Sequence, residues 1–196
     1  MTAMKPRFAQ ASFESCFAAE LPALLVWAEL HLPRSARELI SREDVIVEVW
    51  RRARASWPLP DGKLRAHLFE LANAAFTEIT DLIKRELLFR GGTPESLRAV
   101  RFLEPATDVR EVIRRALASP ELQALLDQVE HLDAEDRHVL LYRGIERLRP
   151  RAAARFARVA PAELSERWRQ LKRRFASWRD LLDGNGNHEA DASGSQ

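Results

Sequence analysis

LDAEDRHVLLYRGIERLRPRAAARFARVAPAELSERWRQLKRRFASW, residues 132–178, is the stretch that decides how this chain folds. It is expected to form two short helices followed by a long one. In the long one, five apolar residues recur at steps of four, three, four and three. That spacing places them on one stripe of a helix, which can bury against the preceding helices. The five are Leu164, Trp168, Leu171, Phe175 and Trp178.

The other face of this long helix is polar and mostly basic. Between residues 147 and 174 there are ten Lys or Arg residues and two acidic ones, so the local net charge is +8. A basic helix that is tied to two short helices by an apolar stripe is the expected form of a helix-turn-helix DNA reader. Asp133 is expected to cap the helix over 134–145, and Pro161 is expected in the first turn of the long helix.

The composition of the whole chain indicates an all-α protein. Glycine is rare, at seven of 196 residues, and no β-branched segment alternates with period two, while Leu, Ala, Arg and Glu dominate. The apolar content of 46 % is enough for buried cores. The formal net charge of +2 is modest, so the concentration of positive charge near the C-terminus is the more informative feature.

The cysteine content and the lengths of the apolar runs indicate the cellular compartment of the protein. The single cysteine, Cys16, excludes an intramolecular disulfide and a cysteine-only metal site, and its neighbours Phe13 and Phe17 favour a small buried side chain. No apolar run approaches the ~20 residues that span a bilayer, and the first residues lack an apolar signal core. We therefore expect a cytoplasmic protein without membrane insertion.

Helical periodicity and punctuation predict two small helical domains joined by a linker. The predicted domains are residues 1–90 and 120–182, with a linker at 91–119 and a disordered tail at 183–196. The linker is broken by prolines but contains a capped helical segment at 108–117. The predicted helices cover 13–32, 36–56 (which a cap at Ser41 would split in two), 63–89, 108–117, 121–131, 134–145, 150–158 and 161–182.

Motifs of enzymatic chemistry are missing. The sequence has no Gly-rich phosphate loop, no GxSxG, no CxxC and no HExxH, and its five histidines are scattered. Asp44 and Glu48 have the spacing of some carboxylate metal sites, but such a bundle also needs a Glu-x-x-His from each of two other helices, and the sequence has a single one, Glu135 to His138. The sequence therefore predicts no catalytic residues, no cofactor and no metal.

Several stretches together resemble the extracytoplasmic-function (ECF) family of bacterial RNA polymerase sigma factors. The first is DVIVEVW, residues 44–50, which is apolar almost all round its helix and so calls for a partner surface. It is similar to a D-L-V-Q-E-V-F-like run that docks on the clamp helices of the polymerase β′ subunit. The resemblance therefore implies polymerase contacts by Asp44, Val45, Glu48, Val49 and Trp50.

The second stretch is RAHLFELANAAF, residues 65–76. It resembles a R-A-W-L-F-R-I-A-R-N-like pattern in a helix that melts the −10 promoter element and holds a flipped base. The match departs at His67, Glu70 and Asn73, where the family carries Trp, Arg and Arg. Binding of the −10 element needs cations for phosphates and polar groups for bases. The residues that could supply them here are Lys63, Arg65, His67, Asn73, Lys84 and Arg85.

The third stretch, RPRAAARFARVAPAELSERWRQLKRRF at 149–175, resembles the family's helix-turn-helix, which reads the −35 element. Ala153, Ala154, Phe156, Val159 and Leu164 fall on its apolar positions. Arg158 stands at the usual glycine of the turn, where a positive φ would strain it. The resemblance places Ser165, Glu166, Arg167, Arg169 and Gln170 in the major groove, with Arg149, Arg151, Lys172, Arg173 and Arg174 on phosphates.

What the resemblance implies is a sigma factor that binds core RNA polymerase (β′ clamp helices and β flap), promoter DNA and an anti-sigma or other inhibitory protein. Two other interpretations stay open. A helix-turn-helix transcription regulator that works without polymerase would dimerise on a palindromic site. A sigma-derived adaptor would bind polymerase or an inhibitor without melting DNA, which the altered −10 helix favours.

Overall fold

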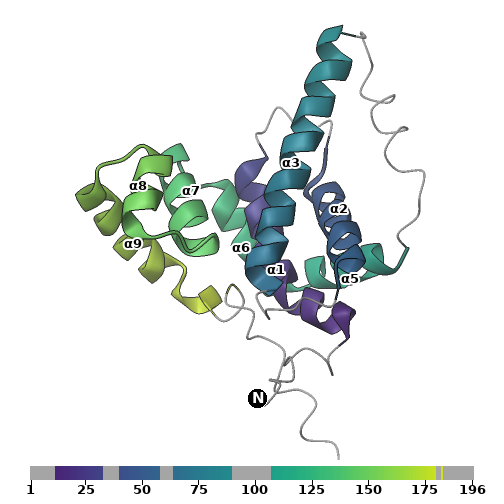
Figure 1. The fold of residues 1–196 in the computed structure, drawn as a ribbon. Helices are drawn as coiled ribbons and strands as arrows, with labels where there is room; N and C mark the ends of the chain where they lie inside the picture. Colours follow the sequence, from purple (N-terminus) through teal and green to yellow (C-terminus); the bar gives the residue numbers. More distant parts are fainter. Residues whose placement is uncertain (1–11, 33–39, 58–63, 90–106, 180–181, 183–196) are drawn as a thin grey trace, which may run out of the picture. The chain divides into compact units, whose positions relative to one another are not determined.

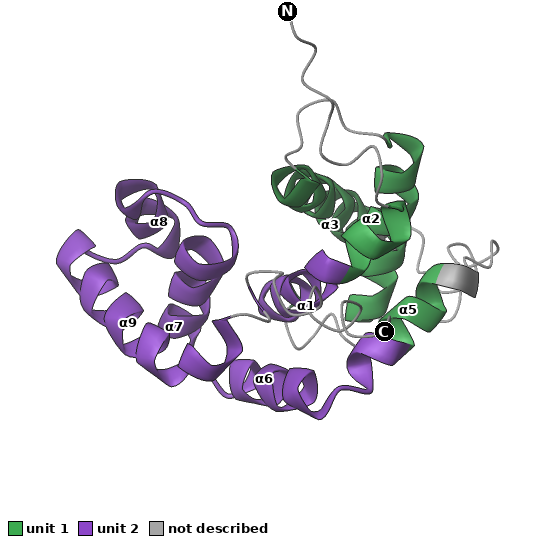
Figure 2. Cartoon of the chain, turned by 90° about the horizontal axis from the view of Figure 1, so that it is seen from below, with its two compact units in different colours: residues 1–18, 32–114 green, residues 19–31, 115–196 purple. Residues whose placement is uncertain are grey.

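The computed structural model describes residues 12–32, 40–57, 64–89, 107–179 and 182 (Figure 1). The regular elements in these ranges are all helical, which confirms the all-α prediction. The chain divides into two compact units, one of residues 1–18 with 32–114 and the other of residues 19–31 with 115–196 (Figure 2). The sequence predicted a linker at 91–119 between the two domains. It did not predict that residues 19–31 group with the C-terminal part.

Unit 1 contains the start of α1 (Phe13–His31), together with α2 (Arg42–Ala55), α3 (Leu64–Phe89) and most of α5 (Thr107–Leu117). Helices α2 and α3 pack against each other. The core of the unit is aromatic where α1 begins, because the Trp50 ring lies 4.6 Å from the Phe13 ring and 4.8 Å from the Phe17 ring, between centroids. Cys16 is half-buried beside this cluster, and burial raises the pKa of its thiol.

Helix α2 begins where its sequence caps it. Ser41 Oγ accepts a hydrogen bond from the Asp44 amide at 3.2 Å, and the Asp44 carboxylate accepts one from the Ser41 amide at 3.0 Å. This reciprocal capping box satisfies two amides that the helix itself cannot bond. The predicted helix start capped by Ser41 is therefore confirmed, and residues 36–39 of the predicted stretch lie outside the described residues.

Unit 2 contains the rest of α1 and a series of short helices. Asp133 caps α7 by accepting a hydrogen bond from the Asp136 amide at 2.7 Å, as the sequence predicts. Ser119 caps α6 in the same way at 3.3 Å. The helices of this unit after α1 are α6 (Pro120–Glu130), α7 (Ala134–Val139), the π-helix η2 (Leu140–Ile145), α8 (Pro150–Ala157), α9 (Pro161–Arg174) and the 3-10 helix η3 (Ala176–Trp178).

The second half of α1 is buried almost all round, since residues 23–28 have no exposed surface. Its sequence explains this, because no charged side chain occurs between Leu21 and Ala28. The end of α1 is held by Arg137, whose guanidinium donates to the Glu29 carbonyl at 2.6 Å and to the Leu30 carbonyl at 3.4 Å. These bonds satisfy carbonyls that the helix leaves open at its C-terminus.

One predicted helix ends earlier than expected, and another changes its helix type before its predicted end. The helix predicted over 161–182 stops at Arg174, because Phe175 leaves helical geometry at φ −102° and ψ 20°. Of the predicted five-residue stripe, Leu164, Leu171 and Phe175 are buried, but Trp168 and Trp178 are only half-buried. The helix predicted over 134–145 changes into a π-helix after Val139, where the Glu146 amide donates to the Leu141 carbonyl at 2.9 Å.

Candidate nucleic-acid interface

Helices α8 and α9 are joined by the three-residue turn 158–160. Arg158 adopts the left-handed conformation there, with φ 56° and ψ 38°. The sequence left the sign of φ open here, and the positive value costs a residue with a side chain roughly 1–2 kcal/mol. The Val159 amide donates to the Ala154 carbonyl at 3.1 Å, which closes the end of α8 and sets the direction in which α9 leaves.

Small side chains bury the inner face of α8. Ala153, Ala154 and Ala157 are buried, whereas Phe156 is 52 % exposed. The predicted apolar position at Phe156 is therefore wrong by one residue, and Ala157 takes its place. Because alanine is short, α8 can lie close to its neighbours α7 and α9. The outward face of α8 carries basic side chains, because Arg151, Arg155 and the following Arg158 are all exposed.

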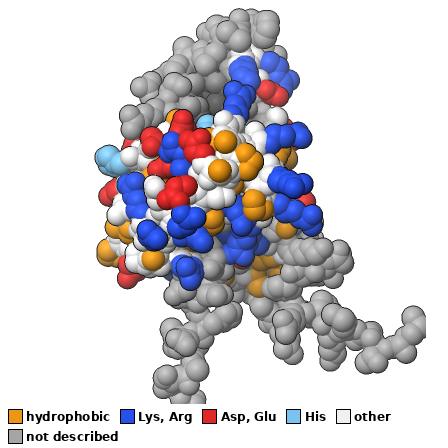
Figure 3. Space-filling model, turned by 90° about the vertical axis from the view of Figure 1, so that its left-hand side faces the viewer, with side chains coloured by type: hydrophobic (Ala, Val, Ile, Leu, Met, Phe, Trp, Pro, Cys, Tyr) orange, Lys and Arg blue, Asp and Glu red, His pale blue; other side chains and the backbone are white. Residues whose placement is uncertain are grey.

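The predicted base-reading residues lie together on α9, and most are accessible. Ser165, Glu166, Arg169 and Gln170 are exposed. A helix of 14 residues is about 21 Å long, and the major groove of B-DNA admits an α-helix. Figure 3 looks onto the side where α8 and α9 lie and shows Lys and Arg over much of the described surface, with one patch where Asp and Glu gather.

Arg167 lies among four carboxylates. Its guanidinium binds Asp136 at 3.0 Å, Glu163 at 3.1 Å and Glu135, and Asp133 is 3.9 Å away. Its side chain is only 26 % exposed, and the hydrogen bonds that it donates to Asp136 and Glu163 raise the pKa of its guanidinium. The structure therefore differs from the expectation of an open Arg167, because reading a base with it requires breaking these ion pairs first.

Glu166 organises the next part of the same helix face. It accepts hydrogen bonds from Arg169 and, at 3.1 Å, from the Gln170 amide. The predicted phosphate-contacting residues Arg149, Arg151, Lys172, Arg173 and Arg174 are all exposed, and no carboxylate of the described residues pairs with them. The exposed cations without a described carboxylate partner therefore include Arg149 and Arg151 at the start of α8 and Lys172, Arg173 and Arg174 in the last turn of α9.

The predicted polymerase-binding residues on α2 are only partly on the surface. Val45 and Val49 have no exposed surface, and Trp50 is 3 % exposed against the rings of Phe13 and Phe17. The apolar side chains of this helix are therefore buried within unit 1. This structure contradicts the predicted surface contacts by Val45, Val49 and Trp50. Asp44 and Glu48 are half-buried.

Glu48 is held by two arginines of its own helix. Its carboxylate lies 3.0 Å from Arg51 and 2.7 Å from Arg52, and Arg52 also binds Glu78 of α3 at 2.6 Å. Burial alone would raise the pKa of Glu48, but the hydrogen bonds from the two arginines outweigh burial and lower it. The outer edge of α2 therefore presents a paired acidic and basic surface rather than a free acidic one.

The predicted −10 residues are spread along α3 rather than gathered. Arg65 and Arg85 are about 30 Å apart along the helix axis, and Lys63 lies outside the described residues. His67 Nε2 lies 2.9 Å from Ser56 Oγ, the Asn73 amide donates to the Phe69 carbonyl at 2.9 Å, and Lys84 lies 3.8 Å from Asp81. The exposed residues between them include Glu70, Glu78 and Asp81, which repel a nucleic-acid backbone.

Arg155 and Arg158 were missed as candidate contacts. Together with Arg151 they recur at steps of four and three, so the sequence already contained the signal of one basic stripe on α8. Arg155 also lies 5.7 Å from the Phe156 ring centroid.

Comparison with known proteins gives no relative for this chain: no family model, no curated protein and no solved structure matches it. Within the described ranges, no group of three or more His, Cys, Asp or Glu side chains could hold a metal ion. None of the described helices combines the length and the apolar character needed to cross a bilayer.

Proposed function

We propose that this chain is a DNA-binding factor of transcription initiation, of the ECF sigma type, which reads duplex DNA with α9. One observation carries the proposal. Two helices joined by a tight left-handed turn present exposed cations on α8 and in the last turn of α9, at Lys172, Arg173 and Arg174, and no described carboxylate pairs with those cations. The turn and the two helices match the connection of a helix-turn-helix reader.

On this proposal the two kinds of contact come from different parts of α9. Arg169 and Gln170 are exposed one turn before the cationic end, and their side chains can bond guanine and adenine edges in the major groove. Lys172, Arg173 and Arg174, with Arg149 and Arg151, contact phosphates and fix the register. Arg167 stabilises the start of α9 through the carboxylates of α7.

The role in initiation rests on the resemblance of residues 44–50 and 65–76 to the sigma family. With Val45, Val49 and Trp50 buried, the part of α2 left for core polymerase is the half-buried Asp44 and Glu48 with the neighbouring arginines. Unit 1 would bind polymerase through this edge, and an anti-sigma or other inhibitory protein would compete for one of the two units.

A second candidate function is favoured by the surface of α3. Glu70, Glu78 and Asp81 are exposed where a melting helix needs cations, and three of the described −10 candidates, His67, Lys84 and Arg85, make hydrogen bonds or ion pairs within the protein. A sigma-derived adaptor or a helix-turn-helix regulator that binds duplex DNA without opening it has no need for a cationic α3.

Transcription in vitro with purified core polymerase tests the proposal and separates the two candidates. We expect the full chain to direct specific transcripts from a subset of genomic promoter fragments, and we expect permanganate footprinting to detect opened −10 bases on them. Duplex binding without opened bases and without transcripts would favour the adaptor or regulator. Absence of both duplex binding and transcripts would contradict both.

A further inference from the structure

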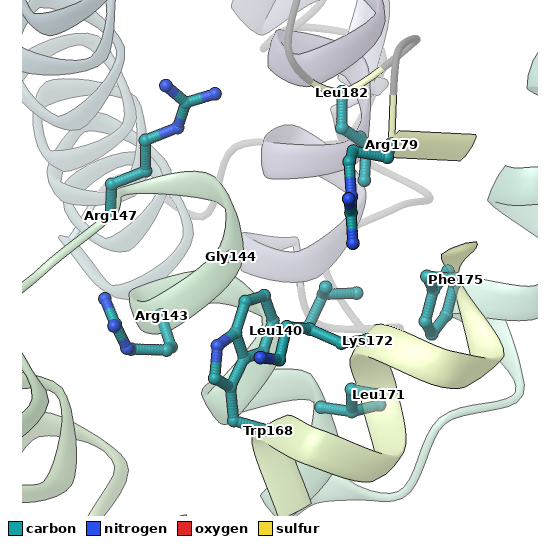
Figure 4. A pocket seen from close by; sticks show the side chains of 10 residues that line it. All are labelled: Leu140, Arg143, Gly144, Arg147, Trp168, Leu171, Lys172, Phe175, Arg179 and Leu182. Atoms are coloured by element: carbon teal, nitrogen blue, oxygen red, sulfur yellow. The ribbon is translucent and has the colours of Figure 1, made fainter. Parts of the chain in front are cut away.

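Unit 2 contains a pocket of about 200 Å³ between η2 and the C-terminal half of α9 (Figure 4). Apolar side chains and a glycine form part of its wall, and the indole of Trp168 stands beside them. The remaining lining side chains are all cationic. The lining residues are Leu140, Arg143, Gly144, Arg147, Trp168, Leu171, Lys172, Phe175, Arg179 and Leu182.

The π-helix shapes this pocket. A Cβ placed on Gly144 would lie 3.1 Å from Trp168 Cζ3 and 3.1 Å from Leu140 Cδ1, which is closer than ordinary contact. Only a glycine lets the backbone of η2 approach the indole without displacing it. Single-turn π segments occur frequently at functional sites, since they redirect side chains without ending the helix. Here Arg143 and Gly144 fall within the segment and line the pocket.

The charged groups around the pocket have one sign. Lys172 Nζ lies 6.0 Å from the centroid of the Trp168 ring, and Arg143 donates to the Leu148 carbonyl at 2.9 Å. No described carboxylate pairs with Arg143, Lys172 or Arg179, and none lines the pocket. A ligand that fits this lining carries negative charge and has an apolar body.

We propose that this pocket binds a small aromatic carboxylate, with its ring against Trp168 and its carboxylate at Lys172 and Arg143. The volume supports one or two fused rings, because an apolar cavity of about 150 Å³ accommodates benzene. Charge-assisted hydrogen bonds from Lys and Arg are the stronger kind for a carboxylate. A nucleobase fits less well, since the lining has no neutral amide or hydroxyl for its edges.

This proposal does not depend on DNA or polymerase, so it can be tested on the full chain alone. The probe is 2-naphthoate, and the controls are its neutral analogue 2-naphthylmethanol and acetate, which lacks the ring. The five tryptophans give separate indole N–H signals in a ¹H–¹⁵N spectrum, and Trp168→Phe identifies the one that belongs to the pocket. We expect 2-naphthoate to shift the Trp168 signal saturably and to leave Trp50 unmoved.

A pair of neighbouring variants decides whether the charge matters. Lys172 lines the pocket and Arg173 does not, while both are exposed on α9. We expect Lys172→Gln to weaken 2-naphthoate binding about fivefold and Arg173→Gln to leave it unchanged. Circular dichroism and thermal melting of both variants establish that they are folded.

The outcomes are distinct. A saturable shift of Trp168 with 2-naphthoate, weaker with 2-naphthylmethanol and absent with acetate, supports the proposal. Equal binding of the acid and its neutral analogue would overturn it, because the cations would then contribute nothing. Equal effects of Lys172→Gln and Arg173→Gln, or no shift of Trp168, would also overturn it.

Discussion

Arg167 was predicted to read a base, and the structure instead surrounds it with the carboxylates of Asp133, Glu135, Asp136 and Glu163. Counting charges along the sequence could not reveal this, because three of these acids lie 31 to 34 residues before Arg167. They come near it only when α7 and α9 pack. The local charge of +8 therefore predicted that the region is basic, but it did not predict that Arg167 is paired with carboxylates.

Removing the Arg167 cation should reduce stability, because four carboxylates would then face one another without it. We expect Arg167→Gln to lower the free energy of unfolding by about 1 kcal/mol at low ionic strength and by less in high salt, since the cluster is partly exposed. Urea denaturation at two salt concentrations measures this, with Arg173→Gln as control. Equal stability of Arg167→Gln and wild type at low salt would show that the cluster contributes nothing.

His31 gives a second residue-scale prediction. Its ring lies against the tilted Trp27 ring with centroids 3.9 Å apart, and burial lowers the pKa of its imidazole to about 4. The unfolded chain has the ordinary value near 6.5 and takes up a proton first as the pH falls. The stability from neutral His31 is thus fully present above pH 6.5 and is lost as the pH falls towards 4.

Between pH 7.5 and pH 5 this linkage removes about 2 kcal/mol from the free energy of unfolding. We expect wild type to lose that much more than His31→Gln over this interval, measured by urea denaturation at each pH. His131→Gln serves as a control, because His131 is exposed at the end of α6 and should behave as wild type. An equal pH dependence of His31→Gln and wild type would contradict this assignment.

Among the elements, the starts of several helices could be predicted from local chemistry. The burial of individual side chains could not be predicted in this way. Ser41 and Asp133 mark helix starts because their side chains accept a hydrogen bond from a backbone amide three residues later. Pro161 marks one because its missing amide hydrogen is not needed in the first turn, and these signals are visible in the sequence. The π-helix over 140–145 and the half-exposed Trp168 depend on how η2 and α9 pack, so no local pattern signals them. The same holds for Trp50, whose partners lie on α1.

The burial of Trp50 leads to a prediction about α2. We expect Trp50→Ala to lower the free energy of unfolding by roughly 3–5 kcal/mol, because it empties a space between Phe13 and Phe17. Arg54→Ala, on the exposed side of the same helix, should change it by less than about 0.5 kcal/mol. Chemical denaturation followed by circular dichroism measures both. A folded and equally stable Trp50→Ala would restore Trp50 as a surface contact.

At the scale of the whole molecule, the sequence predicted the all-α class and the place of the basic helices, but it placed the boundary between units differently. Residues 19–31 group with the C-terminal part although they stand in the first predicted domain. The reason is that α1 is apolar almost all round, and periodicity does not say which neighbours such a helix will meet.

The central claim is that the cations of α8 and α9 bind duplex DNA. Fluorescence anisotropy of the full chain with a labelled duplex, titrated at several salt concentrations, tests it most directly. Five phosphate contacts predict that log K falls with log salt with a slope of about −4 to −5. Replacing Lys172, Arg173 and Arg174 with Gln should reduce the slope by about 2 to 3. Absence of binding at low salt, or an unchanged slope in the folded triple variant, would contradict the claim.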